Sequence, residues 1–182
     1  MKKHRKIISI LEQELNNGFQ VLVQSLEEIS KEEAQWMPSS KSMTLNTIKQ
    51  WNEKGNEWIK SQTLDPLSTI EFKVIHLAQC KLMYDEYAFR DGNLKWSDIE
   101  SPEWPYCIEY LKQTQTRLIE SIQVLIDNKL EELVHTNWGE LWSVKKIIFT
   151  MIQHDYYHLG QIYTVKHLYG TMNREINDEC QR

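Results

Sequence analysis

Two histidines stand four residues apart in a segment that otherwise has the composition of a buried helix. They are His154 and His158, in the stretch MIQHDYYHLGQIY. Residues at positions i and i+4 of a helix share one face, with Cβ atoms roughly 5–6 Å apart. Both rings could therefore bind one metal ion at about 2.0–2.1 Å. The spacing fits a metal site, and it also fits two histidines that hydrogen-bond separately to side chains or water.

A third histidine, His76, strengthens the metal interpretation. It lies midway along the apolar stretch FKVIHLAQCKLMYDEYAF, which has the pattern of another core helix. Buried imidazoles without a common partner are costly, because each has two ring nitrogens to satisfy. We therefore predict a divalent ion held by His76 together with the pair. His135, just before the last helix, is the competing third ligand, whereas His4 and His167 are poorly placed for it.

The pair also has the spacing of the HExxH motif of zinc proteases, with Asp155 in the place of the glutamate base. Aspartate is one methylene shorter, so its reach to a metal-bound water is poor. The extended form of this motif would need a histidine where the chain has Thr164. Too few residues follow Gly170 for another helix to supply a carboxylate ligand. We therefore expect no protease.

Four long segments should position these histidines. In each, apolar side chains recur at intervals of three and four, as on the buried face of a bundle helix. The segments span about residues 6–29, 68–90, 101–125 and 143–169. Capping signals mark helix starts at Ser30 and Ser68, and Ser101 with Pro102 marks the third long helix. The last stripe contains both histidines of the pair, and we expect Gly170 to end that helix.

Residues 39–66 form an insertion between the first two long segments. Its helically spaced apolar residues are Leu45, Ile48, Trp51 and Trp58. The other residues are mostly polar and Gly55 weakens a helix, so we expect a marginal helix on the surface, with the tryptophans as packing anchors rather than pocket walls. The predicted fold is all-α, a four-helix bundle with an extra short helical insertion after the first helix. The chain is long enough to form one domain over residues 1–182.

Composition excludes several classes of function. The 182 residues carry a formal net charge of -5, which disfavours a nucleic-acid partner. We expect no membrane association, because no apolar run approaches the ~18 residues of a spanning helix. Cys80, Cys107 and Cys180 are far apart and odd in number, which favours a reducing compartment over a disulfide framework. We therefore expect a cytoplasmic protein.

Two stretches resemble the DinB-like superfamily, a family of metal-binding four-helix bundles. They are VIHLAQCKLMYDEYAFRDG and IQHDYYHLGQIYTVKHLYG, and the resemblance extends to the order and length of all four helices. In that family, one histidine of the second helix and an HxxxH pair of the last helix bind a divalent ion. His76, His154 and His158 match these ligands, and Gly160 and Gln161 follow the pair as they often do in the family. A mid-helix glycine is costly, so we expect a close helix approach at Gly160.

The resemblance implies either of two enzymatic chemistries. Three neutral imidazoles leave a divalent ion its full charge and at least one open position. Such an ion lowers the pKa of a bound water or binds a thiolate. We expect a metal-dependent enzyme acting on a small-molecule substrate, with transfer involving a low-molecular-weight thiol ahead of hydrolysis. The alternative is a non-catalytic protein in which the ion only clamps two helices.

Several finer expectations accompany this interpretation. Zinc or nickel is the favoured metal, and imidazole ligands also suit iron or manganese. Metal affinity should fall below about pH 6.5, the range of an unperturbed histidine. The polar candidates for groups near the ion are Asp155, Gln161, Tyr84, Tyr157 and Cys80. Members of the family usually pair, so we also predict a homodimer whose interface is rich in tryptophan, drawing on Trp36, Trp96, Trp138 and Trp142.

Overall fold

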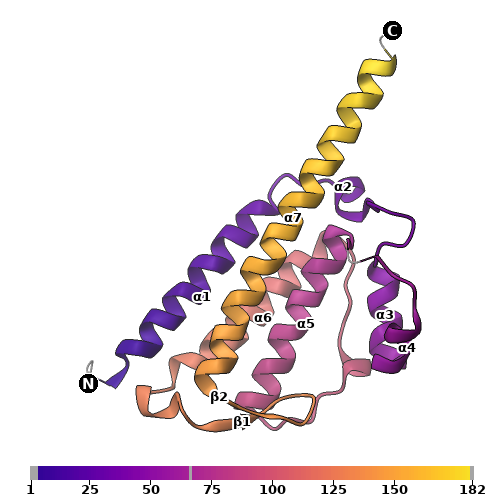
Figure 1. Ribbon diagram of the computed structural model, residues 1–182. Helices are drawn as coiled ribbons and strands as arrows, with labels where there is room; N and C mark the ends of the chain where they lie inside the picture. Colours follow the sequence, from indigo (N-terminus) through magenta and orange to yellow (C-terminus); the bar gives the residue numbers. More distant parts are fainter. Residues whose placement is uncertain (1–3, 66, 181–182) are drawn as a thin grey trace.

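The computed structural model describes residues 4–65 and 67–180, and over these residues it is mostly helical (Figure 1). The four long helices are α1 (Lys6–Ser25), α5 (Ile70–Phe89), α6 (Tyr106–Gln123) and α7 (Val144–Cys180). The shorter elements are α2 (Lys31–Gln35), α3 (Leu45–Lys54), α4 (Asn56–Ser61), η2 (Trp96–Asp98), η3 (Asp127–Lys129), β1 (Leu133–His135) and β2 (Leu141–Ser143). The predicted all-α class is confirmed, apart from this small two-stranded sheet.

The long helices pack side by side around two apolar clusters. Helix α5 contacts both α6 and α7, and α1 contacts the same two helices from the other side (Figure 1). Helix α5 is buried over most of its surface rather than along one stripe, so it is the central helix of this arrangement. It carries His76, and its neighbour α7 carries the histidine pair. The lateral packing of α5 on α7 therefore decides whether the three rings meet.

The first helix is shorter than predicted. It ends at Ser25 rather than at residue 29, because the chain turns there and Glu28 takes a left-handed conformation with φ 65°. Leu26 and Ile29 are nevertheless buried, so the apolar pattern was correct although the helix boundary was not. The predicted start at Ser30 is confirmed, since its hydroxyl accepts a hydrogen bond from the Glu33 backbone N–H.

Two predicted caps serve other purposes. Thr69, not Ser68, caps α5 by accepting from the Phe72 N–H at 3.1 Å. Ser68 instead accepts from the buried ammonium group of Lys73, with 2.8 Å between Nζ and Oγ. Ser101 likewise does not cap α6, which begins at Tyr106. Its hydroxyl instead accepts a hydrogen bond from the side chain of Gln79 in α5. The Ser68 hydroxyl is thus taken by a side chain of the helix that follows it, and the Ser101 hydroxyl by a side chain of another helix.

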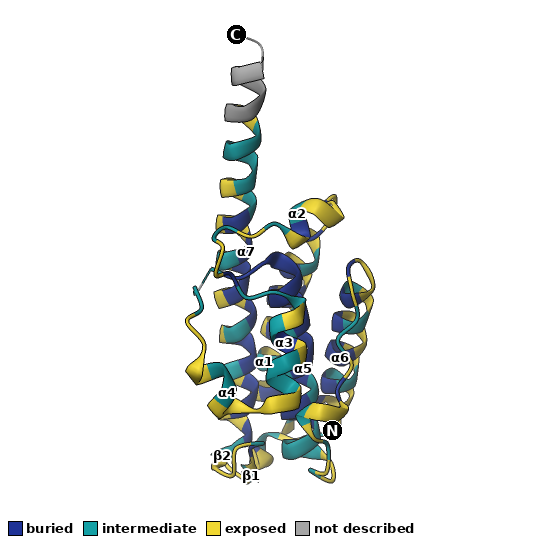
Figure 2. Cartoon of the chain, turned by 90° about the vertical axis from the view of Figure 1, so that its right-hand side faces the viewer, coloured by how far each residue is buried: buried dark blue, intermediate teal, exposed yellow. Residues whose placement is uncertain are grey.

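The last helix continues past Gly170 to Cys180, contrary to the prediction. Its C-terminal part projects beyond the other helices (Figures 1 and 2). Gly160 is exposed, and a Cβ added there would meet no neighbouring atom within 4 Å, so the predicted close approach at this glycine is wrong. The close approach occurs at Gly18 of α1, where a Cβ would lie 3.2 Å from the Tyr156 ring of α7.

The insertion forms two short helices instead of one. Gly55, with φ 81°, separates α3 from α4, as its weakening effect suggested. Helix α3 lies against α5. The β1–β2 hairpin, which the sequence pattern did not reveal, pairs Val134 with Trp142 and contacts α5 as well. Among the described residues, no helix is both long and apolar enough to cross a membrane.

Candidate metal centre

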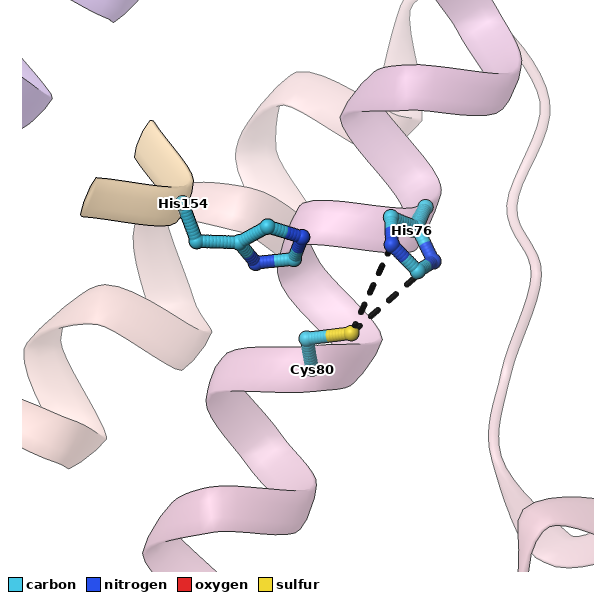
Figure 3. A group of neighbouring side chains, drawn as sticks. All are labelled: His76, Cys80 and His154. Atoms are coloured by element: carbon cyan, nitrogen blue, oxygen red, sulfur yellow. Dashed lines mark hydrogen bonds between the residues drawn. The ribbon is translucent and has the colours of Figure 1, made fainter. Parts of the chain in front are cut away.

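The three predicted histidines converge. The ring centroid of His76 lies 5.1 Å from that of His154 and 5.1 Å from that of His158, and the two rings of the pair are 4.6 Å apart. All three are buried or partly buried. Figure 3 shows the side chains of His76 and His154 directed toward one another from α5 and α7. The three rings are therefore neighbours, and their binding of one shared ion stays a prediction.

Aromatic neighbours hold the orientation of His76. Trp51 of α3 stacks on its ring at a centroid distance of 6.1 Å, and Phe72 stacks at 5.9 Å. Both planes lie within 14° of the imidazole plane, so the ring has little freedom to turn. Trp51 was expected to be a packing anchor rather than a pocket wall. It is both, since it also lines the cavity described below.

Hydrogen bonds prepare the pair to bind a cation. His158 Nδ1 lies 2.8 Å from the side-chain oxygen of Gln161, which can only accept, so this nitrogen carries the proton. His158 Nε2 therefore accepts a hydrogen bond from the His154 Nε2–H, with 3.0 Å between the two nitrogens. A neighbouring carbonyl oxygen fixes metal-binding histidines in this way in known sites. Gln161 thus has a physical role: it directs the His158 lone pair toward its partner ring.

Cys80 stands next to the same rings. Its Sγ lies 3.8 Å from both ring nitrogens of His76 (Figure 3). One ligand atom from each of His76, Cys80 and His154 can be chosen so that all lie within 4.8 Å of one another. In a tetrahedral zinc site, neighbouring ligand atoms are about 3.3–3.6 Å apart, as follows from the usual bond lengths. The 3.8 Å between Cys80 Sγ and the His76 nitrogens is close to this spacing. His158 is not part of the group that meets the 4.8 Å limit.

Burial keeps the three rings in the form that binds metal. It lowers the pKa of His76 to about 3, that of His154 to about 2 and that of His158 to about 4. For His76 and His154 the charge on neighbouring imidazoles contributes to these pKa values after burial. Burial also raises the pKa of the Cys80 thiol to about 12. Without metal, the site at neutral pH therefore contains three neutral imidazoles and a protonated thiol.

These depressed pKa values predict acid sensitivity of the metal-free protein. Each ring titrates near 6.5 in the unfolded chain and well below that in the folded chain, so below about pH 6.5 the unfolded state binds more protons. Stability should be complete above that pH and fall as pH drops. The slope is up to about 1.4 kcal/mol per pH unit for each ring. Urea unfolding between pH 7.5 and 5.5 measures it, and His154→Gln should flatten the curve whereas the exposed His167→Gln should not.

The other polar residues that the sequence placed near the ion differ in their contacts and exposure. Asp155 is buried and pairs with Lys81, with 2.7 Å between Oδ2 and Nζ, so it is engaged away from the rings. Burial raises the pKa of its carboxyl, while Lys81 opposes this. The protease interpretation therefore loses its base. Tyr157 is 62% exposed, and Tyr84 is buried at the wall of the cavity.

The competing histidines do not join the centre. His135 lies in β1 and is exposed, and His4 and His167 are exposed as well. His76 is therefore the third ring of the cluster. The sequence did not point to Gln79, Asn52 or Trp96 as residues of the cavity beside the centre, because none belongs to a recognisable spacing.

A cavity of about 470 Å³ opens beside the centre. Helices α3, α5 and α7 form its walls, together with Trp96 of η2 and the turn of the β1–β2 hairpin. His76, Cys80 and His154 are part of its lining. The volume falls within the usual range for small-molecule sites. The ring cluster is therefore accessible from a chamber large enough for a substrate.

The chain was compared with known proteins. A family model of the DinB superfamily matches residues 14–162, a span that includes all three histidines. The chain belongs to the DinB superfamily. A DinB-like protein from Bacillus cereus ATCC 10987, known from a crystal structure, has the same fold with a TM-score of 0.58 and 14% sequence identity. The similarity covers 88% of this chain and 91% of that one. No curated protein matches.

Proposed function

We propose that this DinB superfamily chain is a metal-dependent enzyme whose divalent ion is held by His76, His154 and His158. The observation that supports the proposal best is the meeting of three neutral rings at the wall of a cavity. In this interpretation α1, α5, α6 and α7 form the family's four-helix bundle, and the insertion closes one side of the cavity. Zinc or nickel is the proposed metal, because imidazole binds both well.

The ion would supply Lewis-acid chemistry: it lowers the pKa of a bound water or binds a thiolate. Transfer involving a low-molecular-weight thiol is our first candidate reaction, because the open position of an ion that keeps its full charge can bind a thiolate. Hydrolysis is the second candidate. The described residues lining the cavity include no aspartate, glutamate, lysine or arginine, so the ion would be the main charge that a substrate meets there.

Screening with both substrate types tests the proposal. Zinc- and nickel-loaded protein would be assayed with neutral esters and anilides, and in parallel with thiol acceptors. We expect turnover with one of the two substrate types, and loss of that turnover in His158→Ala. Turnover that survives in the variant would place the chemistry elsewhere and contradict the proposal.

Whether Cys80 binds the ion distinguishes an open metal site from one filled by four protein ligands. Catalytic zinc sites keep a position free for water or substrate, whereas structural sites are filled by four protein ligands. We expect cobalt-loaded protein to lack a sulfur-to-cobalt charge-transfer band, and Cys80→Ser to change metal affinity by less than about threefold. A strong band that Cys80→Ser removes would identify a fourth protein ligand, and the structural alternative would then be favoured.

Removal of the metal distinguishes an enzyme from a non-catalytic protein in which the ion only holds two helices together. The buried residues of the two apolar clusters should suffice to fold the chain. We expect the chelated protein to keep its far-UV helix signal at 25 °C. Metal should add only the linkage contribution, about 2.7 kcal/mol at a hundredfold excess over the dissociation constant. Unfolding on chelation would show that the ion is structural.

The proposed homodimer now has weaker support. Trp36 contacts Tyr169 at a centroid distance of 5.6 Å, and Trp138 packs against Tyr84 and Trp142. Trp96 lines the cavity. The tryptophans that suggested an interface therefore have partners within the chain. Light scattering at high micromolar concentration measures the oligomeric state directly.

A further inference from the structure

The cavity beside the rings extends along helix α5. Its lining includes His76, Cys80, Met83 and Tyr84, whose spacings of three and four residues put them on one face of that helix. The distance along the helix from His76 to Tyr84 is about 12 Å, or two turns. The cavity therefore has one end at the histidine centre and another end, about two turns away, beside Tyr84.

Trp138 forms part of the wall at this second end. It belongs to the turn of the β1–β2 hairpin, which lies at the C-terminal end of α5 (Figure 1). Its ring meets that of Tyr84 edge-on, with 5.5 Å between the centroids, and that of Trp142 at 5.1 Å. The Gly139 N–H donates to the Thr136 carbonyl oxygen at 3.1 Å and closes the turn. The indole therefore has a defined place in the cavity wall.

Trp138 is nevertheless 45% exposed, although it packs against other aromatic rings and lines the cavity. Burying the rest of this ring would be favourable, because burial of apolar surface lowers the free energy. An aromatic group placed in the cavity would bury it and could also pair with the ring edge-on or in an offset stack. Met83 and Tyr84 extend the apolar surface. We call Met83, Tyr84 and Trp138 the aromatic end of the cavity.

The two ends of the cavity offer different interactions. An ion held by three neutral imidazoles keeps its full charge and attracts an anionic ligand atom. The aromatic end offers flat apolar surfaces instead. A molecule that uses both ends therefore has one group that binds the ion and an aromatic group at a distance of about two helical turns.

We propose that the cavity binds a two-part molecule, with a head group that binds the ion as an anion and an aromatic tail that lies against Met83, Tyr84 and Trp138. This inference deepens the proposed function and rests on it, because the head group needs the ion. A thiol suits the first candidate reaction, since it can lose its proton when its sulfur binds the ion. Trp138 is then a specificity-determining residue, which contacts the tail and takes no part in holding the ion.

Matched probes separate the contribution of the tail from that of the head. Cobalt-loaded full-length protein would be titrated with 3-phenylpropane-1-thiol and with propane-1-thiol, and the sulfur-to-cobalt charge-transfer band would report binding of each thiolate. The competitor 3-phenylpropan-1-ol has the tail without the sulfur. We expect the phenyl thiol to bind at least about fivefold tighter than propanethiol, and the alcohol to bind at least about tenfold more weakly than the phenyl thiol.

Trp138→Ala tests the aromatic end directly. It should weaken binding of the phenyl thiol by roughly threefold to tenfold, the effect of one aromatic pair, and leave propanethiol within about twofold. Trp138→Phe keeps an aromatic ring and should keep the affinity for the phenyl thiol within about threefold. The control is Trp58→Ala on α4, since Trp58 is not among the described residues that line the cavity, and it should change neither affinity. Circular dichroism confirms that each variant is folded.

Equal affinities of the two thiols would overturn the inference, and so would binding of the phenyl thiol that Trp138→Ala leaves unchanged. Cobalt-loaded protein that shows no thiolate band with either thiol would overturn it as well, while the proposed metal site and the hydrolytic candidate would stand. Metal content measured on the same samples identifies failure of the proposed function. Protein that takes up no cobalt would contradict the three-histidine enzyme, and this inference with it.

Discussion

Replacing His158 with alanine should abolish tight metal binding while the protein stays helical. The variant removes the nitrogen whose lone pair the Gln161 contact directs toward His154. Loss of an outer-sphere partner alone typically costs about 10–100-fold in metal affinity. Loss of a direct ligand should therefore cost more than about a hundredfold. Competition titration with a chromophoric chelator measures the affinity, and far-UV circular dichroism measures the helix content.

Two further variants calibrate this result. Gln161→Leu should weaken binding by roughly 10–100-fold, because it removes only the group that orients the His158 ring. His167→Ala, an exposed histidine on the same helix, should leave affinity unchanged. Wild-type affinity in His158→Ala would show that the ring is not a ligand. The same affinity loss in His167→Ala would show that the titration reports nonspecific surface binding.

Asp155→Ala should be the most destabilising substitution near the centre. Lys81 and Asp155 are 0% and 1% exposed, and they join α5 to α7 through a 2.7 Å contact. Removing one member of such a pair leaves the other charge buried without compensation, which costs about 3–5 kcal/mol. The free energy of unfolding, measured with urea, should fall by that amount. The ion pair matters for the site because it lies between the two helices that carry the histidines.

A double variant separates charge burial from packing. Lys81→Met with Asp155→Leu removes both charges and should recover most of the lost stability. Glu132→Ala breaks the exposed Lys129–Glu132 pair and should change stability by less than about 1 kcal/mol. If Asp155→Ala also costs less than about 1 kcal/mol, the carboxylate is not held by Lys81. It would then be free to face the rings, and a role as a base would have to be reconsidered.

The sequence predicted that the three rings lie together because its signal is periodic. His154 and His158 fall on the core face of a regular helix, and that face is set by local geometry alone. His76 could be chosen over His135 because it stood within another apolar stripe, which the structure places in the central helix α5. These inferences needed only helix periodicity and the assumption that apolar faces meet.

Features that depend on lateral packing could not be read from the sequence. Lys81, which pairs with Asp155, lies 74 residues away in the chain, so no local sequence pattern reveals the pair. Ser101 has a good capping spacing, yet its hydroxyl accepts a hydrogen bond from Gln79 of another helix. The strands of the hairpin are three residues each, which is too short for an alternating pattern to stand out. The cavity could therefore not be predicted from the sequence, because it depends on how these segments pack against α5.

A crystal structure of untagged, metal-loaded protein, with anomalous data collected at the absorption edge of the metal, would show whether the three histidines hold an ion. We predict one anomalous peak per chain, bonded to one nitrogen each of His76, His154 and His158 at about 2.0–2.1 Å. We further predict a position on the ion that faces the cavity and is free of protein ligands. Absence of the peak, its appearance at another site, or ring nitrogens that lie more than about 5 Å from any shared point would contradict the three-histidine centre.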